Sequence, residues 1–350
     1  MNTNAMNYIL VSLPYSVMII VMTLPMFERA PDMKLTVGSV SGYPTNLSVS
    51  YMEGRNHTYA CVVQKSQVHT VNWDLKHENV NWDSVQISDL NSEKPISVLQ
   101  KDRQSKIYKD TLDHQKLFQA ALIHPSIRTH PLLVVATTAG VQIFDIRTHK
   151  LLLQQILDSS LEGDVDDEAS VWNMFCRGIT CNDNIILVGT CYGFIMQFIC
   201  NGESSISVRK NLKEHTVAIA DLATCRYDDI TCSADSAGTI IVWQKPVKGV
   251  DVKIATQLVF AHSRPVTCIS VAADSAYVLT GGEDGRFIVY KLHTRKPQAY
   301  QVEYRYSDEL PHSAIMGAQF TNGRGSHIAI SCYDHCAIQM YRIIKKPSQT

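Results

Sequence analysis

One segment recurs along this chain, and the recurrence restricts the fold more than any other sequence feature. When the copies are aligned on a final aromatic residue, VGTCYGFIMQF, SADSAGTIIVW, TGGEDGRFIVY and SCYDHCAIQMY fall in register. They end at Phe198, Trp243, Tyr290 and Tyr341, at spacings of 45, 47 and 51 residues. A period of this length indicates a small supersecondary unit whose copies stack to bury a shared core.

Two weaker copies precede these four. ATTAGVQIF ends at Phe144, and TYACVVQKSQVHTVNW at 58–73 has the pattern of a degenerate strand pair, so six units are recognisable. Each unit supplies three strands, and a fourth comes from the residues before the next unit, for example IATQLVF at 254–260. The chain is therefore predicted to be all-β, with four-stranded blades arranged as a propeller. LSVSYM at 47–52 is expected to add the outer strand of the last blade.

A histidine and an aromatic residue keep a fixed spacing in two of the units. His262 comes 28 residues before Tyr290, and His215 comes 28 residues before Trp243. A catalytic residue needs to occur only once, whereas a structural residue recurs with the fold. The recurrence therefore favours a structural role for both histidines.

The partners expected for His262 are Thr280 in the second strand and Asp284 in the turn that follows it. Alternating strand directions bring this turn and the loop that carries the histidine to one end of the blade. One imidazole nitrogen can then contact the carboxylate and the other can contact the hydroxyl. The other unit has Ser233 at the position of the threonine but Ala237 at the position of the aspartate, so its network is expected to be incomplete.

These segments resemble WD40 repeats. EH at 214–215 and AH at 261–262 correspond to the GH dipeptide of that family, and WQ at 243–244 and YK at 290–291 correspond to its WD dipeptide. The resemblance implies a WD40-type β-propeller.

One WD40 subfamily resembles this chain more narrowly, over about residues 26–343. The similar stretches are TNLSV with RNHTYACVV, CRGITCNDNIILVGTCYG, AHSRPVTCISVA and AISCYDHCAIQMYR. That subfamily carries another repeat between the counterparts of Trp243 and His262, where this chain has only QKPVKGVDVKIATQLVFA. Relative to a seven-bladed family, one blade is therefore either missing from the protein or omitted from the transcript.

Residues 1–27 stand apart from the repeats. YILVSLPYSVMIIVMTLPMF at 8–27 has no charge over 20 residues, enough to cross a bilayer about 30 Å thick. A cleaved signal peptide is disfavoured, because the start is not basic and no small-residue cleavage site follows. Arg29 and Lys34 come after the stretch, so its insertion would leave the rest of the chain in the cytoplasm. Alternatively, translation begins at Met26 and the apolar stretch is an upstream extension.

The charge balance and the spacing of the cysteines limit the ligands and the compartment expected for this chain. Lys plus Arg number 32 and Asp plus Glu number 33, so no overall field favours nucleic acid. The ten cysteines lack the spacing of a disulfide scaffold and are expected to be reduced, which favours the cytoplasm. The stretch from Cys332 to Cys336 lacks four zinc ligands, and the acidic stretch 158–170 lacks the glutamate of a calcium loop. No metal and no cofactor are expected.

Catalytic motifs are not found in the sequence. GxxxxGK[ST], HExxH and GxSxG do not occur. On the predicted innermost strands, only Asp221, Arg177 and His124 supply a charge or an imidazole. The chain is therefore predicted to be non-enzymatic, and a propeller hydrolase is the least favoured alternative.

The predicted organisation is an apolar extension at 1–27, a propeller at 46–344 with a polar insertion at 76–116, and a tail at 345–350. Rigid blades hold several loops on one face, which suits a cytoplasmic scaffold or adaptor for protein or peptide partners. A membrane-anchored or secreted receptor that uses residues 8–27 is the alternative. The predicted partner face comprises Lys213, Glu214, Ser236, Arg264 and Glu283.

Overall fold

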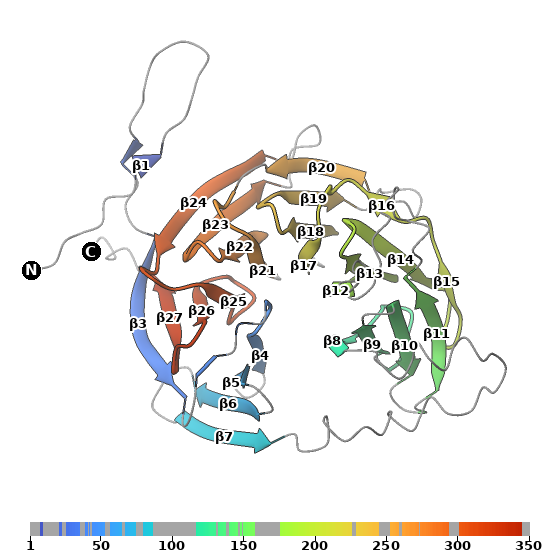
Figure 1. Cartoon of the computed structure of the whole chain (residues 1–350), viewed down its shortest axis with the longest axis horizontal. Coiled ribbons are helices and arrows are strands. Elements are labelled where there is room, and N and C mark those ends of the chain that lie inside the picture. The colour runs from blue at the N-terminus through green and yellow to red at the C-terminus, as the bar shows by residue number, and fades with distance from the viewer. Residues whose placement is uncertain are drawn as a thin grey trace, which may run out of the picture.

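The computed structural model describes residues 8–9, 21–22, 26–35, 39–40, 42, 44–52, 57–64, 67–74, 80–86, 117–130, 132–137, 140–145, 148, 150–157, 176–225, 229–244, 253–258, 261–272, 274–293 and 301–344. All regular elements within these ranges are β-strands. Six sheets are arranged around a centre as blades, and β1 (Tyr8–Ile9) pairs with β2 (Val21–Met22) outside them (Figure 1). The predicted all-β propeller is confirmed.

The strands of each blade are antiparallel and follow one another outward from the centre. The first blade consists of β4 (Ser48–Met52), β5 (His57–Gln64), β6 (Gln67–Asp74) and β7 (Val80–Gln86). The second consists of β8 (Leu117–Ile123), β9 (Leu132–Thr137), β10 (Gly140–Asp145) and β11 (Leu151–Ile156). The third consists of β12 (Cys176–Asn182), β13 (Ile185–Thr190) and β14 (Phe194–Cys200), with β15 (Ile206–Val208) and β16 (Leu212–Lys213) both paired to β14.

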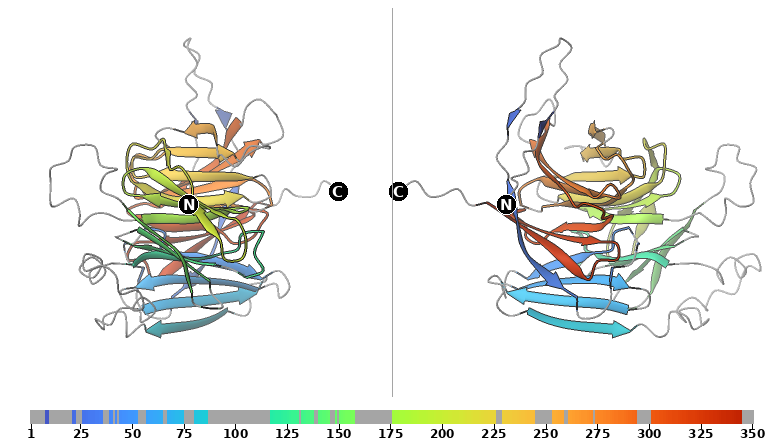
Figure 2. Two further views of the ribbon diagram at one scale, coloured as in Figure 1. Left: turned by 90° about the vertical axis from the view of Figure 1, so that its right-hand side faces the viewer. Right: turned by 60° about the vertical axis from the view of Figure 1, so that its left-hand side comes forward.

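The other three blades repeat this order, with one exception in the last. The fourth consists of β17 (Ile219–Cys225), β18 (Ile230–Asp235), β19 (Ile240–Gln244) and β20 (Lys253–Leu258). The fifth consists of β21 (Val266–Val271), β22 (Tyr277–Gly282), β23 (Arg286–His293) and β24 (Gln301–Glu309). The last consists of β25 (Ile315–Phe320), β26 (His327–Cys332) and β27 (Ala337–Ile343), and its outer strand is β3 (Phe27–Lys34) from the other end of the chain. The side views show these blades as stacked layers of strands (Figure 2).

The position of a strand within its blade explains its sequence. Every residue of β13 and of β18 is buried, because both faces of these second strands pack on neighbouring blades. The outer strand β11 is half-buried along most of its length. The second strands therefore read as nearly continuous runs of apolar and small residues, as the repeat pattern indicates.

Neighbouring blades share their hydrophobic cores. Phe287 and Tyr341, from adjacent blades, have ring centroids 4.8 Å apart in an edge-on arrangement. Phe27 joins the same buried cluster, with its ring centroid 5.4 Å from that of Tyr306. Because each cluster takes side chains from two blades, a blade cannot bury its faces alone.

The expectation for LSVSYM was wrong. The outer strand of the last blade is β3, in which Arg29 lies opposite Tyr341. Residues 48–52 form β4, the innermost strand of a different blade, where Ser48 lies opposite Cys61. A short connection to β5 favours this local pairing. β3 contains Pro31 and several charges, which an outer edge tolerates, and it precedes the domain start predicted at residue 46.

Side chains on the innermost strands tie successive blades together. Backbone N–H groups of one blade donate to side-chain oxygens of the blade before it: Gly178 to Gln119 at 2.7 Å, Ile269 to Asp221 at 3.0 Å and Val49 to Gln319 at 2.7 Å. The innermost strands β8, β12, β17, β21, β25 and β4 contact one another in this order. Among the described strands, β4 and β8 make no comparable contact, so they end the series (Figure 1).

The blade that ends at β20 and the blade that begins at β21 are direct neighbours, because β17 packs against β21. Buried side chains from both, including Val242 and Ile288, belong to one hydrophobic cluster. The two blades therefore pack directly on each other at the place where the resemblance implied a further repeat.

Several predicted segments lie largely outside the described residues: most of 8–27, all of 158–170, most of 76–116 and the tail 345–350. Within the polar insertion, β7 forms the outer strand of its blade. In the part of the chain that is described, no helix has the length and apolar character needed to span a bilayer.

Candidate functional site

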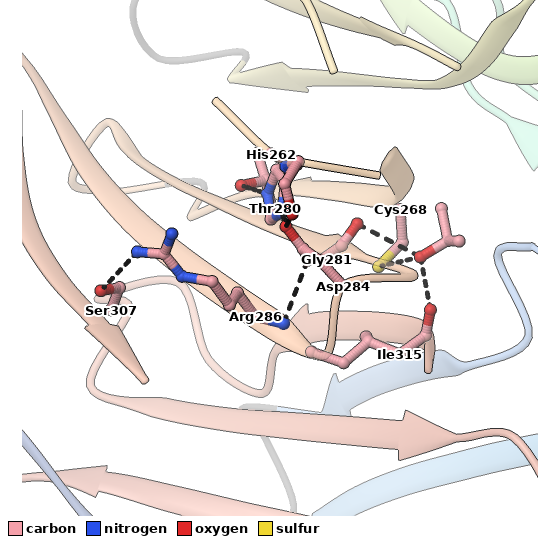
Figure 3. Close-up of polar contacts among 10 residues, drawn as sticks. His262, Cys268, Thr280, Gly281, Asp284, Arg286, Ser307 and Ile315 are labelled. Atoms are coloured by element: carbon pink, nitrogen blue, oxygen red, sulfur yellow. Dashed lines mark hydrogen bonds and ion pairs between the residues drawn. The ribbon is translucent and has the colours of Figure 1, made fainter. Parts of the chain in front are cut away.

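His262 lies on the loop between β20 and β21 and is buried against two side chains of its own blade (Figure 3). Its Nδ1 is 3.0 Å from an oxygen of Asp284, and its Nε2 is 2.8 Å from the hydroxyl of Thr280. A carboxylate accepts, so Nδ1 carries the proton and Nε2 accepts from the hydroxyl. Backbone N–H groups of Ser263 and Arg286 also donate to the carboxylate.

The pKa of Asp284 reflects this environment. Burial alone raises the pKa of the carboxyl, but the hydrogen bonds from His262 and from the two backbone N–H groups outweigh it. The result is a pKa lowered to about 2. The carboxylate is therefore charged at neutral pH and fixes the loop to the turn.

The network around His215 is complete, and the expectation based on Ala237 was wrong. Its Nδ1 is 2.7 Å from an oxygen of Asp235, the last residue of β18, and its Nε2 is 2.6 Å from the hydroxyl of Ser233. The indole N–H of Trp243 donates to the same hydroxyl oxygen at 2.8 Å. The carboxylate comes from the strand end, two residues before the turn position that the alignment indicated.

Gly282 explains why the two blades place their carboxylates differently. It is the counterpart of Asp235, since each pairs at the same bulge with the innermost strand. A Cβ atom at residue 282 would lie 2.7 Å from Nδ1 of His262 and 2.8 Å from an oxygen of Asp284. A carboxylate supplied from the turn therefore requires a residue without a side chain at the strand end.

Tyr290 cannot repeat the hydrogen bond that Trp243 donates to Ser233, because a phenol has no indole N–H. Its ring packs edge-on against Tyr304 at a centroid distance of 6.5 Å. Burial raises the pKa of its hydroxyl. In the described part of the chain, Thr280 thus has one network partner where Ser233 has two.

The combination of histidine, hydroxyl and carboxylate has the composition of a hydrolase catalytic triad. It differs from a catalytic triad because its side chains are not accessible to a substrate. Ser233 is 0%, His215 2% and Asp235 2% exposed. The serine oxygen already contacts both an imidazole and an indole. A nucleophile needs room for a substrate beside it, and this arrangement provides none.

The channel-facing candidates are held by backbone groups. Asp221 is buried and accepts from the N–H groups of Leu222 at 2.9 Å and Ile269 at 3.0 Å. Burial raises its pKa to about 7, although these bonds and Arg177 lower it. His124 makes a separate contact: its Nε2 lies 2.8 Å from the backbone oxygen of Arg128.

Among the described residues, no group of three or more His, Cys, Asp or Glu side chains is placed so that it could bind a metal ion. The ten cysteines are free. Cys332 is buried and Cys336 is exposed.

The predicted partner face gathers at one end of two adjacent blades. Lys213, Glu214, Arg264 and Glu283 are exposed, and Ser236 is half-buried. Loops and turns are fixed to each other by backbone bonds: Ser236 to Ala218 at 2.9 Å, Ala261 to Gly238 at 3.0 Å and Glu283 to Pro265 at 3.0 Å. The Lys213 ammonium lies 4.5 Å above the ring of Phe194. None of the four charged groups forms an ion pair with another described residue.

The repeats, the four-stranded blades and the histidine networks define a WD40-type β-propeller protein. The WD domain, G-beta repeat family matches residues 254–291, and the WDR54 family matches residues 89–256. Within this class, the chain resembles WD repeat-containing protein 54.

Two relatives carry this likeness. WD repeat-containing protein 54 of Mus musculus is 24% identical over 250 residues, covering 58% of this chain and 72% of the mouse protein. The Homo sapiens protein is 22% identical over 258 residues, covering 60% of this chain and 74% of the human protein. Among solved structures, a chain of "Crystal Structure of Mitotic Checkpoint Complex" has a TM-score of 0.47 and 10% identity, over 99% of this chain and 100% of that chain.

Proposed function

We propose that the chain is a non-enzymatic scaffold that presents one end of its propeller to a protein or peptide partner in the cytoplasm. The WD40 class and the likeness to WD repeat-containing protein 54 support a role in protein interaction in general. The observation that carries the specific proposal is the set of exposed charges at 213–214, 264 and 283, which form no ion pair with another described residue. Free cysteines are in keeping with a reducing compartment.

Rigidity is what makes this face suited to binding. The networks of His215 and His262 fix the inter-blade loops to the turns beside them. Loops that are already ordered lose little conformational entropy when a partner binds. Exposed charges on such loops select a partner by electrostatic complementarity and accelerate its association.

Affinity capture tests the proposal. The tagged full chain is expected to recover defined proteins, and Lys213→Glu and Arg264→Glu are expected to reduce that recovery at least fivefold. Lys150→Glu and Arg324→Glu are matched controls, because both residues are exposed on connections at the other end of the blades. Melting temperatures measured for all four variants show whether the fold is kept. Recovery that is unchanged by the first pair, or equally reduced by the second, would contradict the proposed face.

A further inference from the structure

A pocket of about 440 Å³ lies at the same end of the propeller, between the last two blades. Its walls come from the inter-blade loop 310–313, the turn 334–336, the facing strand β27 and the outer strand β3. The lining residues used below are Arg29, Asp32, Pro311, Asp334, His335 and Gln339.

The pocket occupies the corner that an imidazole fills in the two preceding blades. Ala261 donates its backbone N–H to Gly238, and Leu310 makes the same bond to Gly285 of the preceding turn. The next residue is His262 in one loop and Pro311 in the other. Proline has neither the reach nor the nitrogen atoms of histidine, so the corner of the last blade is left open.

Strand register shows that a polar and an apolar side chain have exchanged places there. Thr280 lies opposite Ile288, whereas in the last blade Ile330 lies opposite Gln339. The hydroxyl that would donate to an imidazole nitrogen is thus replaced by the apolar side chain of Ile330. The facing position, apolar in the neighbouring blade, has become a carboxamide.

Gln339 has an unmet hydrogen-bonding need at the pocket wall. The side chain is 4% exposed. Its amide nitrogen lies 3.3 Å from Nδ1 of His335 and 3.8 Å from Sγ of Cys332, while its carbonyl oxygen has no donor within the described residues. A buried acceptor without a donor destabilises the fold, because it has lost its hydrogen bond to water without gaining another. A bound group that supplies an N–H would recover this cost.

The charged groups around the pocket indicate which kind of hydrogen-bond donor would bind there. Arg29 is paired with Asp32 at 2.9 Å, so these two charges offset each other. Within the described residues, the side chain of Asp334 accepts from the neutral hydroxyl of Ser39 at 2.8 Å and has no cationic partner. Glu309, immediately before the loop, is exposed and also has none. The remaining charge of the pocket and its rim is negative.

We propose that this pocket receives an arginine or lysine side chain from a basic segment of a protein partner. The cation would pair with the carboxylate of Asp334 and donate to the carbonyl oxygen of Gln339. Arginine suits the site better, because its guanidinium presents several donors in a fixed plane. This inference rests on the proposed function and names the chemistry of the partner.

Fluorescence anisotropy with labelled hexa-arginine, added to the full chain, tests the pocket directly. Hexa-arginine is expected to bind and hexa-glutamate is not. Asp334→Asn and Gln339→Met are each expected to weaken hexa-arginine binding at least fivefold. Asp334 has φ 57°, which asparagine also adopts, and methionine keeps the volume of glutamine without its carbonyl.

Asp229→Asn is the matched control. This exposed carboxylate also has a left-handed backbone, with φ 53°, but it lies on the turn between β17 and β18 at the other end of a blade. It is expected to change hexa-arginine binding less than twofold. Binding that resists both pocket variants, or that falls equally in the control, would overturn the proposal.

The two proposals fail separately. If captured partners depend on Lys213 and Arg264 while hexa-arginine binding is indifferent to Asp334 and Gln339, the pocket inference is wrong and the scaffold proposal stands. If no partner depends on the charged face while the pocket variants lose hexa-arginine binding, the reverse holds. Gln339→Met is expected to melt at or above the temperature of the parent chain, which separates lost binding from lost folding.

Discussion

Trp243 donates its indole N–H to the hydroxyl oxygen of Ser233 over 2.8 Å. That hydroxyl oxygen is also 2.6 Å from Nε2 of His215. One serine therefore joins the third strand of the blade to the loop that leads into it. The neighbouring blade makes the loop contact through Thr280 but has no indole to complete the set.

This difference predicts unequal costs for removing the two hydroxyls. Ser233→Ala leaves two buried nitrogen atoms without a partner and is expected to lower the free energy of unfolding by about 3 kcal/mol. Thr280→Val leaves one and keeps the side-chain shape, so about 1.5 kcal/mol is expected. Urea denaturation at pH 7 measures both. Equal losses would show that the indole bond contributes nothing.

Gly282 provides a test of the alternative carboxylate positions. Gly282→Ala places a methyl group against the imidazole of His262 and the carboxylate of Asp284, and is expected to cost about 1–3 kcal/mol of unfolding free energy. Gly202→Ala is the control, because a Cβ atom there meets nothing within 4 Å, and a change within about 0.5 kcal/mol is expected. A tolerated alanine at residue 282 would contradict the described contacts.

Asp221 makes stability depend on pH. Burial raises the pKa of its carboxyl from 3.8 to about 7, so the folded chain binds this proton more tightly than the unfolded chain. The resulting stabilisation is present below pH 3.8 and is lost as the pH rises through about 7. At about 1.4 kcal/mol for each pH unit, the loss is on the order of 4 kcal/mol.

Asp221→Asn cannot titrate and is expected to remove this fall between pH 4.5 and pH 8. The variant loses an acceptor and is less stable at the lower pH, so the relevant quantity is the difference between the two pH values. Urea denaturation at both pH values measures it, with Asp229→Asn as an exposed control that retains the parent slope. An unchanged slope in Asp221→Asn would show that the carboxyl does not titrate in this range.

The outer strand β3 predicts where the chain can be shortened. A chain that begins at Met26 keeps Phe27–Lys34 and is expected to melt at the temperature of the full chain. A chain that begins at Leu35 loses the strand paired with β27 and the buried ring of Phe27. Burial of one such side chain contributes about 1.5–3 kcal/mol, so a clear fall in melting temperature is expected. Equal melting temperatures for the two shortened chains would contradict the pairing.

The repeat period was sufficient to predict the propeller, because blades can bury their faces only by stacking. It did not identify the strand that completes the last blade. β3 contains proline and charged residues and lies more than 300 residues from its partner Tyr341, so nothing local marks the pairing. LSVSYM has the better strand pattern, but it pairs with the strand that immediately follows it.

The site was predictable to the extent that its residues kept their spacing. His262, Thr280 and Asp284 contact one another at the positions that the spacing indicates. Asp235 was missed because a carboxylate can reach the same imidazole from the turn or from the strand end, and only three-dimensional geometry distinguishes the two. The pocket beside Pro311 and Gln339 was also missed, since it results from an exchange between facing strands that no linear motif records.

Hydrogen–deuterium exchange of the full chain, alone and with a captured partner, tests the central claim most directly. Binding at the proposed face predicts slower exchange at 213–216, 235–238, 261–265 and 282–285, and at 334–336 if a basic segment occupies the pocket. Exchange at 183–184, 274–276 and 321–326, on turns at the other end of the blades, is expected to stay unchanged. Protection confined to those turns would contradict the account.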